Sequence, residues 1–145
     1  MYEFLQRVKP SDAQDFEIKG RMAWAIHCYW AGRSSMEGGD RTTAITMLRE
    51  GILAFPFPLT LELLGECLLL EGKPVEATVY LAAAVGMNEE HQFRQLFLLG
   101  KALAAANDNY VSKIMLKKAI AIKQDQEALE LLNEVVSRSA PENIP

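Results

Sequence analysis

One eight-residue pattern recurs three times in this chain at intervals of about 34 residues. It occurs at residues 28–35, 61–68 and 96–103, as CYWAGRSS, LELLGECL and LFLLGKAL. Each copy is followed by turn residues and then by a second apolar stretch with small residues and a leucine at matching positions. Such repetition is typical of stacked helix pairs, none of which buries its apolar face alone. The sequence therefore predicts an all-α solenoid of three helix pairs.

The glycine at the centre of each copy indicates how the two helices of a pair meet. Gly32, Gly65 and Gly100 lie in the middle of predicted helices, where glycine costs up to about 1 kcal/mol relative to alanine. We expect close approach of the second helix to offset that cost. Turn residues then separate the two helices of each pair, at 38–39, 72–74 and 107–109.

Helix boundaries follow from the apolar spacing and from these turns. The six predicted repeat helices cover 25–37, 41–54, 58–71, 74–87, 92–106 and 109–123. A leading helix, capped by Ser11 and Gln14, precedes them and can continue into the first repeat. After them, Asp125 can cap a final helix that ends before Pro141. We predict a single domain, 1–145, with repeats at about 25–57, 58–91 and 92–124 and a C-terminal capping helix at about 125–139.

Composition and charge exclude several classes of function. The formal net charge of −4 argues against a surface that follows nucleic acid or an anionic membrane, because both need clustered cations. Residues 1–10 lack the basic and then apolar layout of a secretory signal, and no apolar stretch reaches the length of a membrane span. We therefore expect a cytoplasmic protein with no nucleic-acid or membrane partner.

Sequence signatures of catalysis are missing. The chain has no phosphate-binding glycine loop, no HExxH zinc motif and no nucleophile elbow. His27 and His91 stand apart, which makes a metal site unfavourable, and Cys28 and Cys67 lie within apolar helical patterns typical of buried free cysteines. We expect no enzymatic activity, no cofactor and no metal.

The repeats resemble the tetratricopeptide repeat (TPR) family over about residues 25–124. The glycine and small-residue positions agree in all three copies, whereas Cys28, Leu61 and Leu96 stand where the family often has tryptophan. Ser112 replaces an alanine in the third copy, and the terminal proline is present only as Pro56. One alternative is the pentatricopeptide repeat, which reads RNA and which the acidity of the chain disfavours. Another is an ordinary helical bundle with a coincidental period.

The resemblance implies a concave groove, lined by the first helix of each pair, that receives a peptide. Carried onto this sequence, the groove positions are Ile26, Tyr29, Trp30, Arg33, Met36, Leu59, Glu62, Leu63, Glu66, Leu69, Arg94, Phe97, Leu98 and Lys101. Family members that hold the acidic C-terminus of heat-shock chaperones use a clamp of lysine, arginine and asparagine. Here the matching positions keep only two cations, Arg33 and Arg94, so an acidic peptide end is disfavoured.

These features favour binding of another protein. The leading hypothesis is an adaptor or chaperone that binds an apolar or amphipathic segment of a client, in which Glu62 and Glu66 pair with basic residues of that segment. Short three-repeat proteins of this kind are similar to the bacterial type III secretion chaperones. The alternative is a homo-oligomeric scaffold or a structural subunit of a larger complex. A stripe of methionine and aromatic residues is also compatible with a helix core, and that interpretation stays open here.

Overall fold

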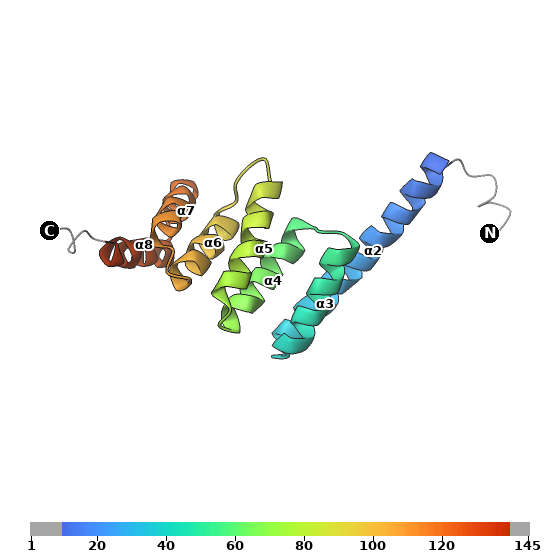
Figure 1. Ribbon diagram of the computed structural model, residues 1–145, viewed down its shortest axis with the longest axis horizontal. Helices are drawn as coiled ribbons and strands as arrows, with labels where there is room; N and C mark the ends of the chain where they lie inside the picture. Colours follow the sequence, from blue (N-terminus) through green and yellow to red (C-terminus); the bar gives the residue numbers. More distant parts are fainter. Residues whose placement is uncertain (1–9, 140–145) are drawn as a thin grey trace. The chain divides into compact units, whose positions relative to one another are not determined.

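The computed structural model describes residues 10–139, and within this range every regular element is an α-helix. The helices are α2 (Pro10–Glu37), α3 (Arg41–Ala54), α4 (Pro58–Leu70), α5 (Pro74–Met87), α6 (Phe93–Ala105), α7 (Asn109–Ile122) and α8 (Gln126–Arg138). They form two compact units: α2 and α3 within Met1–Phe57, and α4 to α8 within Pro58–Pro145 (Figure 1). The boundary between the units is the predicted boundary between the first and second repeats. The single-domain expectation stays a prediction.

The predicted all-α architecture is confirmed, and apart from the start of α2 the repeat helices begin and end within two residues of the predicted boundaries. The leading helix and the first repeat helix are one continuous helix, α2, of 28 residues. Its beginning differs from the predicted capping box. Since α2 starts at Pro10, Ser11 lies inside the first turn, and a proline whose missing N–H would be unpaired anyway occupies the first position. The side chain of Ser11 lies outside the described part of the chain.

The central glycines make the close helix contact that the sequence predicts. In each pair, a Cβ atom added to the glycine would lie 2.4–2.7 Å from the side chain of a leucine on the second helix. That distance is far inside van der Waals contact, so only glycine leaves room for the leucine. The three pairs are Gly32 with Leu48, Gly65 with Leu81 and Gly100 with Leu116. The same contact at the same register defines all three repeats.

Equivalent residues with positive φ end the first helix of each pair. Gly39 has a φ of 85°, Gly72 of 75° and Asn107 of 65°, in the left-handed region that glycine and asparagine adopt most readily. In each turn, backbone N–H groups beyond the helix donate to carbonyls of its last turn; for example, Asp108 N–H donates to the Leu103 carbonyl at 2.9 Å. The side chain of Asp108 then accepts from the first turn of α7. One helix is thus stopped and the next started within a few residues.

The first unit has a narrow core. Ala25 and Cys28 of α2 are fully buried, as are Ala44 and Leu48 of α3, the helix on which α2 packs, and Cys28 is a free thiol, as predicted. Burial raises the pKa of this thiol, and the nearby charge of Glu50 raises it further. The N-terminal half of α2 extends past α3 (Figure 1), and Phe16 is exposed there, as is Trp24 in the middle of the helix. A large part of the α2 surface therefore carries apolar side chains that this unit does not cover.

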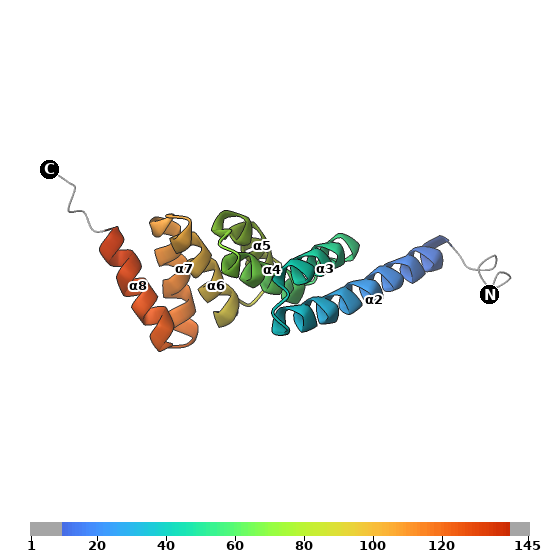
Figure 2. The same cartoon turned by 90° about the horizontal axis from the view of Figure 1, so that it is seen from below.

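The second unit has a continuous core centred on α6, which contacts α4, α5, α7 and α8. Leu96 and Leu116 are fully buried, and α8 closes the cluster with Ala128 and Val135 (Figure 2). The predicted capping helix is thereby confirmed. Ser112, which differs from the family pattern, is also buried, and its hydroxyl donates to the Gly100 carbonyl at 2.6 Å. A hydrogen bond across the pair thus satisfies this buried hydroxyl.

Candidate functional site

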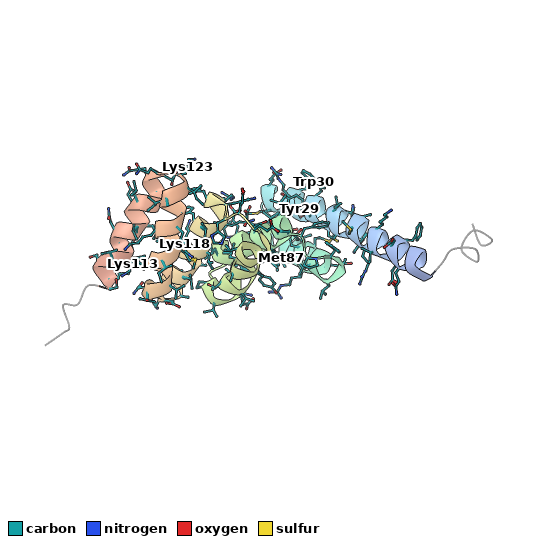
Figure 3. All side chains as sticks on the ribbon, turned by 90° about the horizontal axis from the view of Figure 1, so that it is seen from above. Tyr29, Trp30, Met87, Lys113, Lys118 and Lys123 are labelled. Carbon is teal, nitrogen blue, oxygen red and sulfur yellow. The ribbon has the colours of Figure 1, made fainter. Side chains whose placement is uncertain are left out.

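In the first unit, the predicted binding residues form an exposed surface on α2. Trp30 is 57% exposed and its ring packs edge-on against Tyr29, with 5.2 Å between ring centroids. The guanidinium of Arg33 lies 5.5 Å from the Trp30 ring centroid, and its Nε lies 3.3 Å from Glu37 Oε1. Ile26 is exposed one turn before Trp30, and Met36 is half-buried. Figure 3 labels Tyr29 and Trp30 on this helix.

A shallow hollow adjoins this surface. Its volume is about 310 Å³, and it is open to solvent. The residues that line it are Trp30, Arg33, Ser34 and Glu37. A hollow beside a large exposed aromatic ring suits an apolar side chain of a ligand, because aromatic residues dominate the energetics of protein interfaces. The α2 surface thus offers an apolar contact area, and the guanidinium of Arg33 beside it is already paired with Glu37.

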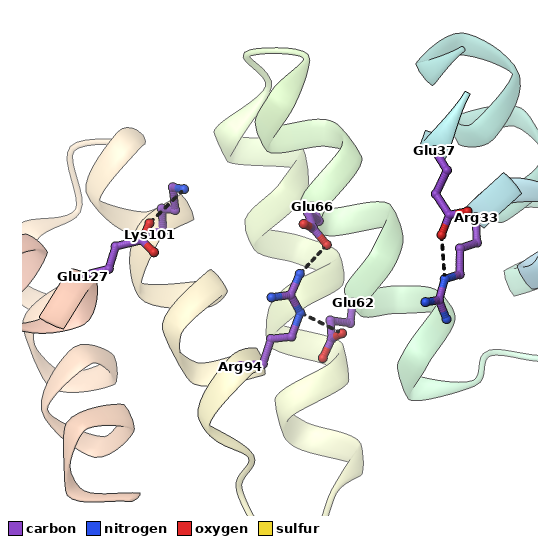
Figure 4. A network of polar contacts seen from close by, with 7 residues as sticks. All are labelled: Arg33, Glu37, Glu62, Glu66, Arg94, Lys101 and Glu127. Atoms are coloured by element: carbon purple, nitrogen blue, oxygen red, sulfur yellow. Dashed lines mark hydrogen bonds and ion pairs between the residues drawn. The ribbon is translucent and has the colours of Figure 1, made fainter. Parts of the chain in front are cut away.

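In the second unit, Arg94 of α6 lies between two carboxylates of α4 (Figure 4). Arg94 Nη2 lies 2.7 Å from Glu66 Oε2, and Arg94 Nε lies 3.5 Å from Glu62 Oε2. Two acids share one base, so this cluster carries a net negative charge. The sequence predicted each of these residues separately, and the structure brings the three together.

Burial sets the protonation behaviour of Glu62. Its side chain is only 12% exposed, and this burial is the main reason that its pKa is raised above the ordinary value. The positive charge of Arg94 and a hydrogen bond with Gln95 act in the opposite direction. Gln95 is itself buried, and its side-chain oxygen accepts a hydrogen bond from Asn88. Glu62 is thus held in a polar network that continues into the core.

The apolar groove residues of the second unit divide into two groups. Leu59 is exposed, and Leu63 and Leu69 are half-buried. Phe97 is 8% exposed and Leu98 is 5% exposed. Phe97 stacks on Phe93, with 5.8 Å between ring centroids, and belongs to the core cluster that α8 closes. Phe97 and Leu98 therefore offer little surface to a ligand in this arrangement, which agrees with the core interpretation for these two residues.

Each predicted groove cation has a carboxylate partner. Arg33 pairs with Glu37 and Arg94 with the two α4 glutamates, while Lys101 Nζ lies 3.9 Å from Glu127 Oε1 of α8. Such partly exposed pairs stabilise the fold only slightly, but they neutralise the local positive potential. The predicted surface therefore lacks an uncompensated positive charge for an acidic ligand.

Sequence reasoning missed two residues that shape these surfaces. Glu37, which neutralises Arg33, lies one helical turn further along α2, and this i, i+4 spacing of opposite charges was available as a signal. Gln95 gave no such signal, because a glutamine inside an apolar helix pattern does not reveal its buried partners. His27 is exposed and stacks on Trp24 with 5.2 Å between ring centroids.

Among the described side chains, no group of three or more histidine, cysteine, aspartate or glutamate residues is placed to hold a metal ion. Within the described helices, none is long and apolar enough to span a membrane.

Comparison with known proteins identifies the fold. No protein-family model matches the sequence, and no curated protein matches it significantly. Among solved structures, the first TPR domain of Spaghetti (RPAP3) bound to the HSP90 peptide SRMEEVD matches with a TM-score of 0.73 and 18% identity, covering 82% of this chain and 98% of that one. The first TPR domain of human RPAP3 also gives 0.73 at 18% identity, over 84% and 98% of the two chains. The Arabidopsis OM64 TPR domain gives 0.74 at 12% identity, over 81% and 98%. The chain has the TPR fold.

Proposed function

We propose that this chain is a protein-interaction adaptor or chaperone, with no enzymatic activity of its own, that binds an apolar or amphipathic segment of a client protein. The observation that carries the proposal is the α2 surface, where Trp30 is exposed beside a hollow, Ile26 is exposed one turn earlier, and the guanidinium of Arg33 next to Trp30 is already paired. A helix whose apolar face has no cover within its own unit is suited to bind a partner. The cytoplasmic location predicted from the sequence is compatible with this role.

Charge distinguishes this proposal from acidic peptide binding. One structural neighbour is bound to SRMEEVD, a peptide with three acidic residues. In the present chain Arg33 and Arg94 stand at the positions that the family resemblance assigns to an acid clamp, and both face carboxylates of the same chain. An acidic ligand would have to displace Glu37 or Glu66 from its arginine. An apolar segment has no such competitor.

On the second unit, the surface of α4 and α6 has a charge preference of its own. Leu59 is exposed and Leu63 half-exposed at the same helix that carries Glu62 and Glu66. Because the two glutamates share a single arginine, a lysine or arginine of the client would supply the missing positive charge. We therefore expect a client segment whose apolar residues are accompanied by basic residues.

The experiment uses peptides of defined composition. A fluorescein-labelled amphipathic peptide of about 15 residues, rich in leucine and lysine, is titrated with the full chain. A second peptide, in which glutamate replaces each lysine, is titrated in the same way for comparison. We expect tighter binding of the leucine–lysine peptide and a loss of at least about tenfold in affinity for Trp30→Ala. Trp24→Ala is the matched control, because Trp24 is also exposed on α2 but lies on a different side of that helix.

Two results would contradict the proposal. If Trp24→Ala and Trp30→Ala bind equally well, the α2 surface defined above is not the contact. If the glutamate peptide binds more tightly than the lysine peptide and loses that affinity in Trp30→Ala, the ligand of the α2 surface is acidic. Circular dichroism must first show that both variants are as helical as the parent.

A scaffold role is the second candidate, and α5 provides a specific reason to consider it. Val75 and Val79 are exposed one turn apart, and the exposed positions that follow them, at 82, 83, 86 and 87, are all occupied by apolar residues or glycine. Small residues on a helix face allow close packing against another helix, including that of a second copy. Sedimentation of Val75→Lys/Val79→Lys against the parent tests this candidate. A parent that is monomeric at high concentration would remove it.

A further inference from the structure

Helix α7 contains several lysines but no acidic residue. Between Asn109 and Ile122 it contains Lys113, Lys117 and Lys118, and no aspartate or glutamate. Lys123 follows at the C-terminal end of the helix. Lys117 and Lys118 are exposed and Lys113 is half-buried. Since the whole chain has a formal net charge of −4, this helix is a local exception to an acidic molecule.

The lysines lie on the outward side of α7, and the opposite side of this helix is packed in the core of the second unit. Leu116 and Ala119 of α7 are fully buried, and the hydroxyl of Ser112 donates to the Gly100 carbonyl. Lys113 and Lys117 are one turn apart, and Lys118 is adjacent to Lys117. Lys117 and Lys118 lie on the side away from these buried residues, and half-buried Lys113 lies at the edge of that side. Figure 3 labels Lys113, Lys118 and Lys123 along this helix. The charges are thus presented on a rigid support.

Ion pairing separates these lysines from other cations of the chain. Arg33, Arg94, Lys101 and Arg138 each lie within 4 Å of a carboxylate oxygen. Among the side chains that the structure describes, the recorded ion pairs include none with Lys113, Lys117 or Lys118. The positive potential of the α7 surface is therefore not cancelled by short-range partners.

Apolar side chains flank this charge. Tyr110 is 69% exposed at the start of α7, and the Lys113 ammonium lies 5.9 Å from the centroid of its ring. Ile122 is exposed at the other end of the helix. A surface that combines an exposed tyrosine with lysines has both an apolar contact and charges that can steer a partner.

We propose that the outward surface of α7, formed by Tyr110, Lys113, Lys117 and Lys118, binds a short acidic segment of a partner protein that also carries apolar residues. α7 is the second helix of its pair, so this surface is distinct from the first-helix surfaces of the proposed function and is independent of it. One chain could then hold a client segment and an acidic partner at the same time.

The size of the basic surface favours a short segment over a long polyanion. Charges are screened beyond roughly 8 Å at physiological ionic strength, so a short peptide experiences only the local lysines. Nucleic acid or an anionic membrane would extend over the acidic remainder of the chain and be repelled by it. An acidic peptide can match the three lysines and avoid that repulsion.

The test measures fluorescence anisotropy of a labelled peptide of about ten residues that alternates glutamate with leucine. We expect the full chain to bind it, with weaker binding at high salt, and we expect Lys113→Glu/Lys117→Glu/Lys118→Glu to weaken binding by at least about tenfold. The control Lys19→Glu/Arg21→Glu/Lys73→Glu changes the net charge equally through exposed cations elsewhere and should bind like the parent. If this charge-reversed α7 variant is less helical than the parent, a variant with glutamine at the same three positions is used in its place.

Four outcomes would overturn the proposal. If a peptide with glutamine in place of each glutamate binds as tightly, the contact is purely apolar. If the control variant loses as much affinity as the α7 variant, the effect is one of net charge. If the chain binds vesicles containing phosphatidylserine but not the acidic peptide, α7 binds a membrane surface. A folded α7 variant that retains full affinity would also exclude this helix.

Discussion

Helices α2 and α6 carry the same repeat pattern at the same register, yet they differ strongly in burial. Both place a central glycine against a leucine of the following helix. Within its unit α2 packs on α3, whereas α6 contacts four helices and buries nine of its residues. The matching positions Trp30 and Leu98 show the difference clearly, since they are 57% and 5% exposed. The repeat pattern therefore fixes how a helix meets its pair partner, and the neighbours beyond the pair decide which of its other residues become surface.

Replacing Trp30 and Leu98 separately gives the largest expected contrast. Leu98→Ala should lower the free energy of unfolding by about 3 kcal/mol, because it leaves a cavity among closely packed helices. Trp30→Ala removes a larger side chain but should cost less than about 0.5 kcal/mol, because most of that side chain is in water. Urea unfolding followed by far-ultraviolet circular dichroism measures both. Tryptophan fluorescence would not suffice, since Trp24 and Trp30 both lie on α2.

Equal costs at the two positions would break the comparison. Such a result would mean that Trp30 is covered in solution, as it would be if a second copy packed on α2. Repeating the Trp30→Ala measurement over a range of protein concentrations separates these cases, because only a covered interface makes the cost depend on concentration.

Alanine at the central glycines should sharpen the same comparison, with a smaller contrast between the two helices. At Gly32 and at Gly100 the new Cβ would lie 2.7 Å from a leucine carbon. We expect Gly100→Ala to cost about 3 kcal/mol, since α6 is held on several sides and cannot move away. Gly32→Ala should cost about 1–2 kcal/mol, because α2 can shift away from α3. Both values come from urea unfolding followed by circular dichroism.

Gly86→Ala is the control for the glycine series, since a Cβ at that position would meet no atom within 4 Å beyond the neighbouring residues and backbone of its own helix. It should stabilise α5 by up to about 1 kcal/mol, the ordinary gain of alanine over glycine in a helix. If Gly32→Ala costs as much as Gly100→Ala, the two helix pairs are equally rigid, and the contrast between α2 and α6 is limited to their surfaces.

Arg94 on α6 and Arg33 on α2 extend the comparison of these two helices to the dependence of stability on pH. Arg94→Ala should cost about 1 kcal/mol near pH 7, because it leaves the buried Glu62 carboxylate without its cation. The pKa of Glu62 is already raised by burial, and loss of Arg94 raises it further. The folded variant then binds a proton more tightly than the unfolded chain does. Its stability should therefore fall, relative to the parent, as the pH rises from about 4 to 7. Urea unfolding at the two pH values measures this effect.

Arg33→Ala is the matched substitution on α2. Arg33 and Glu37 are both exposed, so we expect no measurable change in stability at either pH. A cost of Arg94→Ala that is the same at pH 4 and pH 7 would contradict the assignment of this effect to Glu62. It would point instead to the packing of the arginine side chain.

Most of the fold could be predicted from the sequence, and the reason lies in a few residues. Gly32, Gly65 and Gly100 recur at one register, and their need for a close helix neighbour predicted every pair correctly. The beginning of α2 was less predictable, because a helix can start at Pro10 or be capped by Ser11 with almost the same local pattern. Local signals thus determine helices and turns well, while the ends of isolated helices remain ambiguous.

The candidate site was less predictable than the fold. Family register assigned Phe97 and Leu98 to a binding surface, but the packing of α6 against α8 buries Phe97, and α6 also contacts α4 and α5. Register alone does not contain this information, since it depends on contacts between repeats and with the capping helix. The neutralisation of Arg94 by Glu62 and Glu66 also depends on the distance between α4 and α6. The groove assignment as a whole stays a prediction, to be tested one surface at a time.

The smallest expected effect compares the turns after α2 and α6. Gly39 and Asn107 occupy equivalent positions with φ values of 85° and 65°. Asparagine tolerates this region less well than glycine, so Asn107→Gly should stabilise the chain by about 0.5 kcal/mol and Gly39→Asn should destabilise it by a similar amount. Urea unfolding of the two single variants and of the double variant measures whether each substitution raises or lowers the free energy of unfolding. If Asn107→Gly destabilises instead, the asparagine side chain contributes more to its turn than the backbone strain costs, and the two turns are not equivalent.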